Sequence, residues 1–296
     1  MKQKLLAIMT ILLLLEVTAV DQNTMAVRSA SKEKSSTVVL DTPSFGYYQS
    51  DQVSDKKSKP VKLKLKSSKT NNITDEEQWF EKNKISIPTY QVPNSFRNLS
   101  GNLPEGIASE WQGLMITSAF YDASYIYCTY GKDFSEGYIL TIYDSETLKI
   151  VYSLDFSNYR YSPKYVVADY DYIQQRINWA EIKDNILYVS HSHNTYAKSS
   201  NNQNAYITAI DLTDLSILWR TKALVSNSYN FVILDHVIIC GYGFTAEPDY
   251  LYQVDLNTGK VLDKQPIKTA ASYIIKKGST LYVRTYNTDY QFKIAQ

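Results

Sequence analysis

The sequence predicts an all-β fold built from repeated antiparallel sheets. Residues 250–263 carry a complete hairpin pattern, in which side chains alternate as in a half-buried strand before a tight turn that contains Gly259. The same order of hydrophobic residue, Asp, short polar turn and strand recurs at residues 143–152 and 210–219. In each copy the Asp carboxylate can accept backbone N–H groups of the turn that follows it, which fixes the corner without a ligand. Repetition on this scale is typical of propellers and solenoids.

The composition restricts the class of protein. A chain of 296 residues, 44% of them hydrophobic, can bury a sizeable core. The formal net charge of +1 gives no overall electrostatic reason to expect nucleic-acid binding. The 26 tyrosines suit half-buried strand faces, where the ring packs and the hydroxyl meets water, although a tyrosine-lined binding site would use the same residue type.

Residues 1–19 carry the pattern of a signal peptide. Lys2 and Lys4 precede an apolar run over residues 5–15, and small residues up to Ala19 suit a cleavage site. An apolar run of this length is too short to span a bilayer. We therefore expect a secreted or cell-envelope protein with no transmembrane anchor in its mature chain.

Residues 20–72 are predicted to form a polar, largely disordered arm, because they are rich in Ser and Lys and poor in large apolar groups. The excess of Lys is compatible with a solvated tether or with weak attraction to an anionic cell-surface polymer. Within the arm, residues 61–66 alternate apolar and Lys side chains, as an edge strand protected by charge does.

Residues 73–112 are expected to lead into the repeats. Thr74 and Glu77 form a capping-box pattern ahead of Trp79 and Phe80, which predicts a short helix. Three prolines in the following residues then favour a loop.

Hairpin turns divide residues 113–296 into four repeats. The turns lie at residues 122–124, 184–185, 235–236 and 276–279. Each turn is followed by an apolar strand core, a variable loop, a third strand that ends in an Asp turn, and an outer strand. This order predicts a small β-propeller of about four four-stranded blades. The last repeat lacks its outer strand, and we expect residues 61–66 to supply it and close the ring.

The third Asp corner resembles a known repeat. Residues 255–262 hold Asp, Thr, Gly and Lys in the order of the core of PQQ-like (quinoprotein-type) β-propeller repeats of bacterial exported proteins, and Leu218 with Trp219 supplies the Leu-Trp ending of that motif. The chain departs from the pattern at Tyr152 and Asp263, where a Trp is expected. Such propellers serve as quinone-dependent dehydrogenases, as scaffolds in outer-membrane protein assembly and as other binding modules. The resemblance therefore implies the fold and leaves the function open.

The His and Cys residues do not combine into a site. On an extended strand His191 and His193 would point to one face, as metal ligands can, but His236 lies about 20 Å away by strand rise. Cys128 and Cys240 occupy equivalent positions in non-adjacent blades, too far apart for the Cα spacing of about 5.5 Å that a disulfide needs. We expect two buried, unpaired thiols and no metal site.

The repeat frame places long connections on one side of the fold and tight turns on the other. Binding residues concentrate on loops that a rigid scaffold holds. Residues 241–249 combine aromatic and acidic side chains on a loop with flexible glycines, and an inner strand directs Glu181 toward the same central mouth. The candidate binding residues are Glu181, His191, His193, Tyr242, Phe244, Glu247, Arg284 and Tyr286.

These observations predict an exported, non-catalytic propeller that binds a partner protein or a cell-envelope glycan through its long-loop face. The alternative is an extracellular enzyme of the lyase or hydrolase type, with Glu181 and His191 or His193 in the central mouth. No spacing in the sequence requires these groups to meet, and we assign no catalytic residue. We expect no cofactor either, because the adjacent cysteines and calcium site of quinone-dependent enzymes are not visible.

Overall fold

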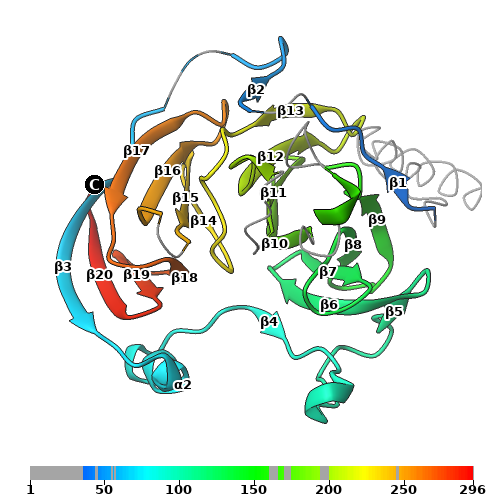
Figure 1. The fold of residues 1–296 in the computed structure, drawn as a ribbon, viewed down its shortest axis with the longest axis horizontal. Coiled ribbons are helices and arrows are strands. Elements are labelled where there is room, and N and C mark those ends of the chain that lie inside the picture. The colour runs from blue at the N-terminus through cyan, green and yellow to red at the C-terminus, as the bar shows by residue number, and fades with distance from the viewer. Residues whose placement is uncertain are drawn as a thin grey trace, which may run out of the picture. The chain divides into compact units, whose positions relative to one another are not determined.

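A computed structural model describes residues 36–43, 46–54, 56, 58–159, 166–169, 175–193, 200–244 and 247–295. The predicted signal peptide at residues 1–19 lies outside these residues. Residues 37–296 form one compact unit. Within it, the prediction of an all-β fold with four sheets is confirmed (Figure 1).

Each sheet begins as a meander of consecutive antiparallel strands, with an inner strand first. The first sheet contains β6 (Leu114–Tyr121), β7 (Tyr125–Gly131), β8 (Ile139–Asp144) and β9 (Ile150–Asp155). The second contains β10 (Arg176–Lys183), β11 (Ile186–Ser192), β12 (Tyr206–Asp211) and β13 (Ile217–Arg220). The third contains β14 (Val232–Leu234), β15 (Val237–Tyr242), β16 (Tyr250–Asp255) and β17 (Val261–Pro266). The fourth has three strands of its own, β18 (Ala271–Lys277), β19 (Thr280–Thr285) and β20 (Thr288–Ala295).

The Asp corners form as predicted. Asp144 Oδ1 accepts a hydrogen bond from the backbone N–H of Thr147 (2.8 Å), and Asp211 Oδ1 accepts one from that of Thr213 (2.7 Å). Asp255 Oδ1 accepts two, both at 2.9 Å, from the turn that follows it. These bonds satisfy turn N–H groups within the corner, so the repeated Asp is a structural residue.

The N-terminal arm adds strands to three sheet edges. β1 (Val38–Val39) pairs in parallel with β9, and β2 (Tyr48–Gln49) pairs antiparallel with β13. β3 (Lys62–Thr70) pairs antiparallel with β20 and completes the fourth sheet. This part of the arm therefore forms edge strands, where the composition indicated disorder.

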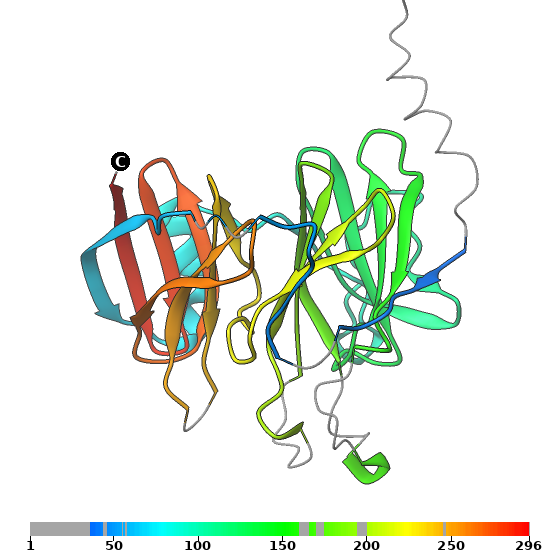
Figure 2. The ribbon, with the colours of Figure 1, turned by 90° about the horizontal axis from the view of Figure 1, so that it is seen from above.

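The predicted pairing of residues 61–66 with the last repeat is observed, and the strand extends to Thr70. Figure 2 shows β3 along the outer edge of the last sheet, beside β20. The expected burial of alternate apolar residues holds only in part, because Leu65 is 49% exposed. A register shift opposite Lys66 places Phe292 beside Leu65 and Gln291 beside Ser67, and such a bulge reverses the side-chain alternation.

Between β3 and the first sheet, the chain forms short elements. These are η1 (Ile73–Asp75), α2 (Glu76–Asn83), β4 (Thr89–Tyr90), η2 (Ser95–Arg97) and β5 (Glu110–Trp111). α2 confirms the predicted helix, although the capping box forms earlier than expected, between Asn72 and Asp75. β4 and β5 both pair with β6. A further short element, η3 (Val167–Asp169), lies between β9 and β10.

The hydrophobic core is continuous from the first sheet to the third, and a second cluster joins the third sheet to the fourth. In the described residues, no core cluster contains side chains of both the fourth and the first sheet. Closure of the sheets into a propeller ring is therefore not found.

The second and third sheets are joined through Trp219. Its indole Nε1 donates a hydrogen bond to the carbonyl oxygen of Leu256 (3.2 Å), and its ring covers Gly259, which has φ +69. A Cβ atom at position 259 would lie 2.4 Å from the Trp219 ring. Glycine is thus required twice, for the turn and for this close approach.

Cys128 and Cys240 are both buried and unpaired, as predicted. Burial raises the pKa of the Cys128 thiol to about 12, so it is a neutral core side chain.

Candidate functional site

The inner strands β6, β10 and β18 line two cavities, and β14 lines one of them. Each inner strand starts beside the end of the second strand of its sheet, from which the long connection leaves, and ends at a tight turn. We call the cavity near the strand starts the loop-end cavity and the one near the tight turns the turn-end cavity. Ile87 and Trp179 line both.

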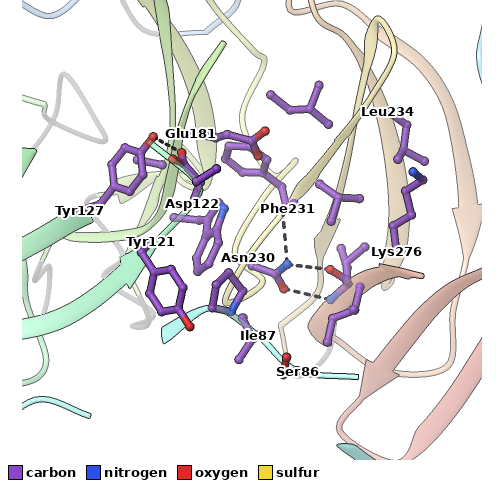
Figure 3. Close-up of a pocket in the computed structure, with 18 residues that line it drawn as sticks. Ser86, Ile87, Tyr121, Asp122, Tyr127, Glu181, Asn230, Phe231, Leu234 and Lys276 are labelled. Carbon is purple, nitrogen blue, oxygen red and sulfur yellow. Dashed lines mark hydrogen bonds between the residues drawn. The ribbon is translucent and has the colours of Figure 1, made fainter. Parts of the chain in front are cut away.

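The turn-end cavity has a volume of about 580 Å³ and mostly apolar walls (Figure 3). Its apolar residues come from all four sheets and from the segment before β4. They include Ile87, Pro88, Trp179, Phe231, Ile233, Leu234, Ile274 and Ile275. Cavities of this size and character are the usual sites for small ligands.

Two carboxyl groups lie on one side of the turn-end cavity. Asp122 belongs to the β6–β7 turn and accepts hydrogen bonds from the N–H groups of Ser124 (2.7 Å) and Tyr125 (2.8 Å) and from the Tyr127 hydroxyl (2.6 Å). Glu181 projects from β10 and has no hydrogen bond to another described residue. The two carboxyl groups thus differ, because only Asp122 is satisfied by the protein.

Burial and, to a lesser extent, the charge of Asp122 raise the pKa of Glu181 from its ordinary value of 4.5 to about 7, against a smaller opposing effect of Lys183. The Lys183 ammonium group donates a hydrogen bond to the carbonyl oxygen of Asp235 (2.6 Å) and none to Glu181. Glu181 can therefore gain or lose a proton near neutral pH.

Asn230 joins the third and fourth sheets at the cavity wall. Its amide donates to the carbonyl oxygen of Ile274 (2.6 Å) and accepts from the N–H of the same residue (3.0 Å). Its second N–H donates to the carbonyl oxygen of Phe231 (3.3 Å), so the side chain bonds as a peptide group would in a strand pair and both its donors have partners (Figure 3).

The loop-end cavity is smaller, about 280 Å³, and is more polar. Tyr90, Tyr229 and Tyr273 line it together with Arg176 and Asn178. Tyr229 is 48% exposed, and its ring lies against that of Tyr273 with a centroid distance of 5.3 Å. This end of the inner strands thus offers aromatic faces to solvent.

The polar groups of the loop-end cavity retain bonding capacity. Asn178 Nδ2 donates to Ser192 Oγ (2.8 Å), which leaves its carbonyl oxygen without a bond to a described residue. The guanidinium group of Arg176 has no ion pair or hydrogen bond within the described part of the chain. A ligand with several hydroxyl or carboxyl oxygens could use both groups.

The structure does not bring the predicted residues together. Of the eight candidates, Glu181 alone lines either of these cavities, and it lies at the turn end. His191 pairs with Ile177, near the start of β10, about 13 Å along the strand from Glu181. An acid–base pair of these two residues is not formed.

His191 and His193 are buried inside the second sheet. His191 Nε2 lies 2.9 Å from Thr208 Oγ1, and the ring stacks on Tyr206. Burial, with a contribution from nearby Arg220, lowers the pKa of His191 to about 3. The backbone of His193 exchanges two hydrogen bonds with the side chain of Asn204 (2.9 and 3.0 Å).

Tyr242, Phe244 and Glu247 form a local group at the β15–β16 connection. The Tyr242 hydroxyl donates to Glu247 Oε2, and Phe244 packs against the core. The N–H of Glu247 donates to the carbonyl oxygen of Phe244 (2.9 Å). These bonds shape the loop.

Arg284 fastens the N-terminal segment to the fourth sheet. Its guanidinium pairs with Asp75 (2.5 Å) and Asp289 (2.9 Å), and lies 5.5 Å from the Trp79 ring centroid. Tyr286 is 61% exposed on the β19–β20 connection.

The residues that line the loop-end cavity were not predicted from the sequence. Arg176, Asn178, Tyr229 and Tyr273 all lie at or just before the start of an inner strand. The order of strands in the four repeats could have indicated them, because residues at equivalent ends of the four inner strands face the same space.

The described residues contain no group of three or more His, Cys, Asp or Glu side chains placed to hold a metal ion. In the same part of the chain, no helix has the length and apolar character needed to cross a membrane.

No protein-family model matches the sequence, and the curated proteins contain no match. Similar solved structures include the computationally designed Ika4 protein, with 11% identity and a TM-score of 0.40 over 66% of this chain and 100% of that one. BamB from Moraxella catarrhalis has 12% identity and a TM-score of 0.35, over 58% and 56% of the two chains. The dihydro-heme d1 dehydrogenase NirN has 8% identity and a TM-score of 0.39, over 68% and 38%. The chain thus spans about half or less of these two natural proteins.

Proposed function

We propose that this chain is an exported, non-catalytic binding protein of the four-bladed propeller type, related in its repeats to PQQ-like propellers. It takes a partner protein or a cell-envelope glycan on its long-loop face, and the loop-end cavity is the centre of that surface. The proposed binding face is the one expected from the sequence. Its residues are those that line the loop-end cavity, in place of the candidate residues that the structure does not bring together.

The observation that carries the proposal is the meeting of Tyr90, Tyr229, Tyr273, Arg176 and Asn178 at the starts of the inner strands. Tyrosine combines a rigid apolar ring with a polar hydroxyl and is favoured at recognition surfaces. Arg176 and Asn178 add planar polar groups with unused bonding capacity.

This chemistry favours a glycan over a protein partner. A sugar ring offers apolar C–H faces that pack on aromatic rings, and its hydroxyl or carboxyl oxygens can accept hydrogen bonds from Arg176. The cavity of about 280 Å³ has room for only a short part of a chain, such as a terminal residue of a glycan.

A glycan array and a pull-down of cell-envelope material test the proposal. Tyr229→Ala and Arg176→Ala should each weaken binding at least tenfold, while Tyr286→Ala, which removes an exposed tyrosine outside the cavity, should leave it unchanged. Equal binding by the wild type and both cavity variants would refute the proposal. Capture of a protein that these variants no longer bind would favour the protein partner.

The enzymatic alternative depends on Glu181, whose pKa of about 7 suits proton transfer. The turn-end cavity lacks the expected His partner, since His191 and His193 lie elsewhere. An activity screen of the wild type beside Glu181→Gln tests this alternative. Turnover that disappears in the variant would favour the enzyme.

A further inference from the structure

The turn-end cavity lies at the opposite ends of the inner strands from the proposed recognition surface. Arg176 and Glu181 are about 17 Å apart along β10, so a ligand in one cavity need not contact polar groups of the other. The turn-end cavity also has a different chemistry, with an apolar interior and one carboxyl group that the protein leaves unsatisfied.

The potential donors around Glu181 form hydrogen bonds with other groups. The Tyr127 hydroxyl donates its proton to Asp122 and accepts the N–H of Ile182 (3.0 Å). Lys183 bonds to the carbonyl oxygen of Asp235, and the amide of Asn230 bonds to Ile274. No described neighbour therefore supplies a donor to Glu181, and a bound molecule could do so.

The charges around the cavity are unevenly placed. Glu181 and Asp122 lie on one side, and Lys276 lies across the cavity on β18, near Leu234 (Figure 3). A positive group on a ligand would be attracted to the acidic side, while the hydrocarbon part would lie between Trp179 and Phe231.

We propose that the turn-end cavity binds a small apolar molecule that carries one primary ammonium group, with the ammonium on Glu181 and the hydrocarbon against Trp179 and Phe231. An ammonium group supplies three donors and a full charge, which meets the need of a carboxylate in an apolar wall. A divalent metal ion fits less well, since Asp122 is already used by three donors.

The raised pKa of Glu181 gives this binding a second signature. Near neutral pH the free carboxyl group is partly protonated, and a bound cation favours the ionised form. Binding of the ammonium ligand at about pH 7 should therefore release a proton, in proportion to the protonated fraction.

The test uses 2-phenylethylammonium as the probe, with 2-phenylethanol and 3-phenylpropionate as neutral and anionic controls, and the full chain in calorimetric titrations. The ammonium should bind at least tenfold more tightly than either control. Glu181→Gln should weaken ammonium binding at least tenfold and leave binding of the alcohol unchanged. Lys276→Gln is a matched charge control on the opposite wall, and ammonium binding should not weaken in it.

Proton release is measured on the wild type alone, by titration in two buffers of different ionisation enthalpy, so it holds even if Glu181→Gln does not fold. Equal affinity for the ammonium and the alcohol, or no proton release near pH 7, would overturn the proposal. Tyr229→Ala should keep ammonium binding, which separates this site from the loop-end cavity.

Discussion

The boundary between the second and third sheets differs in kind from that between the fourth and first. At the former, Trp219 is buried against Leu256 and Gly259, within a continuous core. At the latter, no described core cluster joins the sheets, and residues 72–90 span the boundary. On one side this segment is fastened by Arg284, and on the other β4 pairs with β6.

We expect this difference to link stability with access to the cavities at the boundary between the fourth and first sheets. Residues 86–88 line the turn-end cavity, and residues 87, 89, 90 and 92 line the loop-end cavity. The segment that joins the fourth and first sheets is thus a wall of both cavities. A change at the Trp219 boundary should affect stability alone, and one at the Arg284 boundary should affect both.

The largest effect is expected for Trp219→Ala. The side chain is 1% exposed, and removal of a buried Trp costs about 3–5 kcal/mol of the free energy of unfolding. Urea denaturation measures this loss, and hydrogen exchange at residues 84–90 should stay as in the wild type. A loss below about 1 kcal/mol in the free energy of unfolding would show that the indole contributes little to the contact between the second and third sheets.

Arg284→Ala should lower stability by about 2 kcal/mol, because it removes a buried guanidinium that bonds to the partly exposed carboxylates of Asp75 and Asp289. Unlike Trp219→Ala, it should also increase hydrogen exchange at residues 84–90. Lys277→Ala is the control, since its exposed ammonium group bonds only to two carbonyl oxygens of the same segment. Unchanged hydrogen exchange at residues 84–90 in Arg284→Ala would contradict the expected link between stability and access to the cavities.

Tyr152→Ala should cost less than Trp219→Ala, roughly 1–2 kcal/mol. Tyr152 occupies the position of Trp219 in the first sheet, but it is only half-buried. Its pKa is raised first by burial, then by Tyr125 and by Asp211 of the next sheet, so it lies near the corresponding corner. Denaturation of both variants under one condition gives the comparison, and an equal loss would contradict this ranking.

The smallest effect concerns the protonation of Glu181. Its pKa is higher in the folded chain than in the unfolded one, so the folded state binds the proton more tightly. The stabilisation is complete below the unfolded pKa of about 4.5 and is lost as the pH rises through about 7. Glu181→Gln should flatten this part of the stability curve between about pH 5 and about pH 8. Parallel curves for the wild type and the variant would contradict the assignment.

The local parts of the fold were predictable. The Asp corners follow from side chains that bond to their own turns, and residues 62–66 carry the charge alternation of an edge strand. Three of the four hairpin turns contain Asp, Asn or Gly at positive φ, which these residue types tolerate. β1 and β2 were not predicted, because a strand of two residues leaves too little alternation to recognise.

The candidate site was less predictable, because it depends on which distant segments meet. Arg284 has the charge and repeat position of a binding residue, but its partner Asp75 lies far earlier in the chain. Likewise, the space beside Trp179 is bounded by residues of the three other sheets. The sequence alone therefore could not show that this space is divided into a loop-end and a turn-end cavity. Glu181 was identified correctly as an inner-strand carboxyl, but its position at the tight-turn end required the register of β10.

The pairing of β3 with β20 also has a kinetic consequence. Lys62 lies opposite Ala295, so the fourth sheet cannot be complete until two segments far apart in the chain have both been synthesised. Contacts between such distant residues slow folding, because a long loop must close before they form. A nascent chain would therefore keep this sheet open until β20 has been made, and deletion of residues 288–295 would remove the partner of β3.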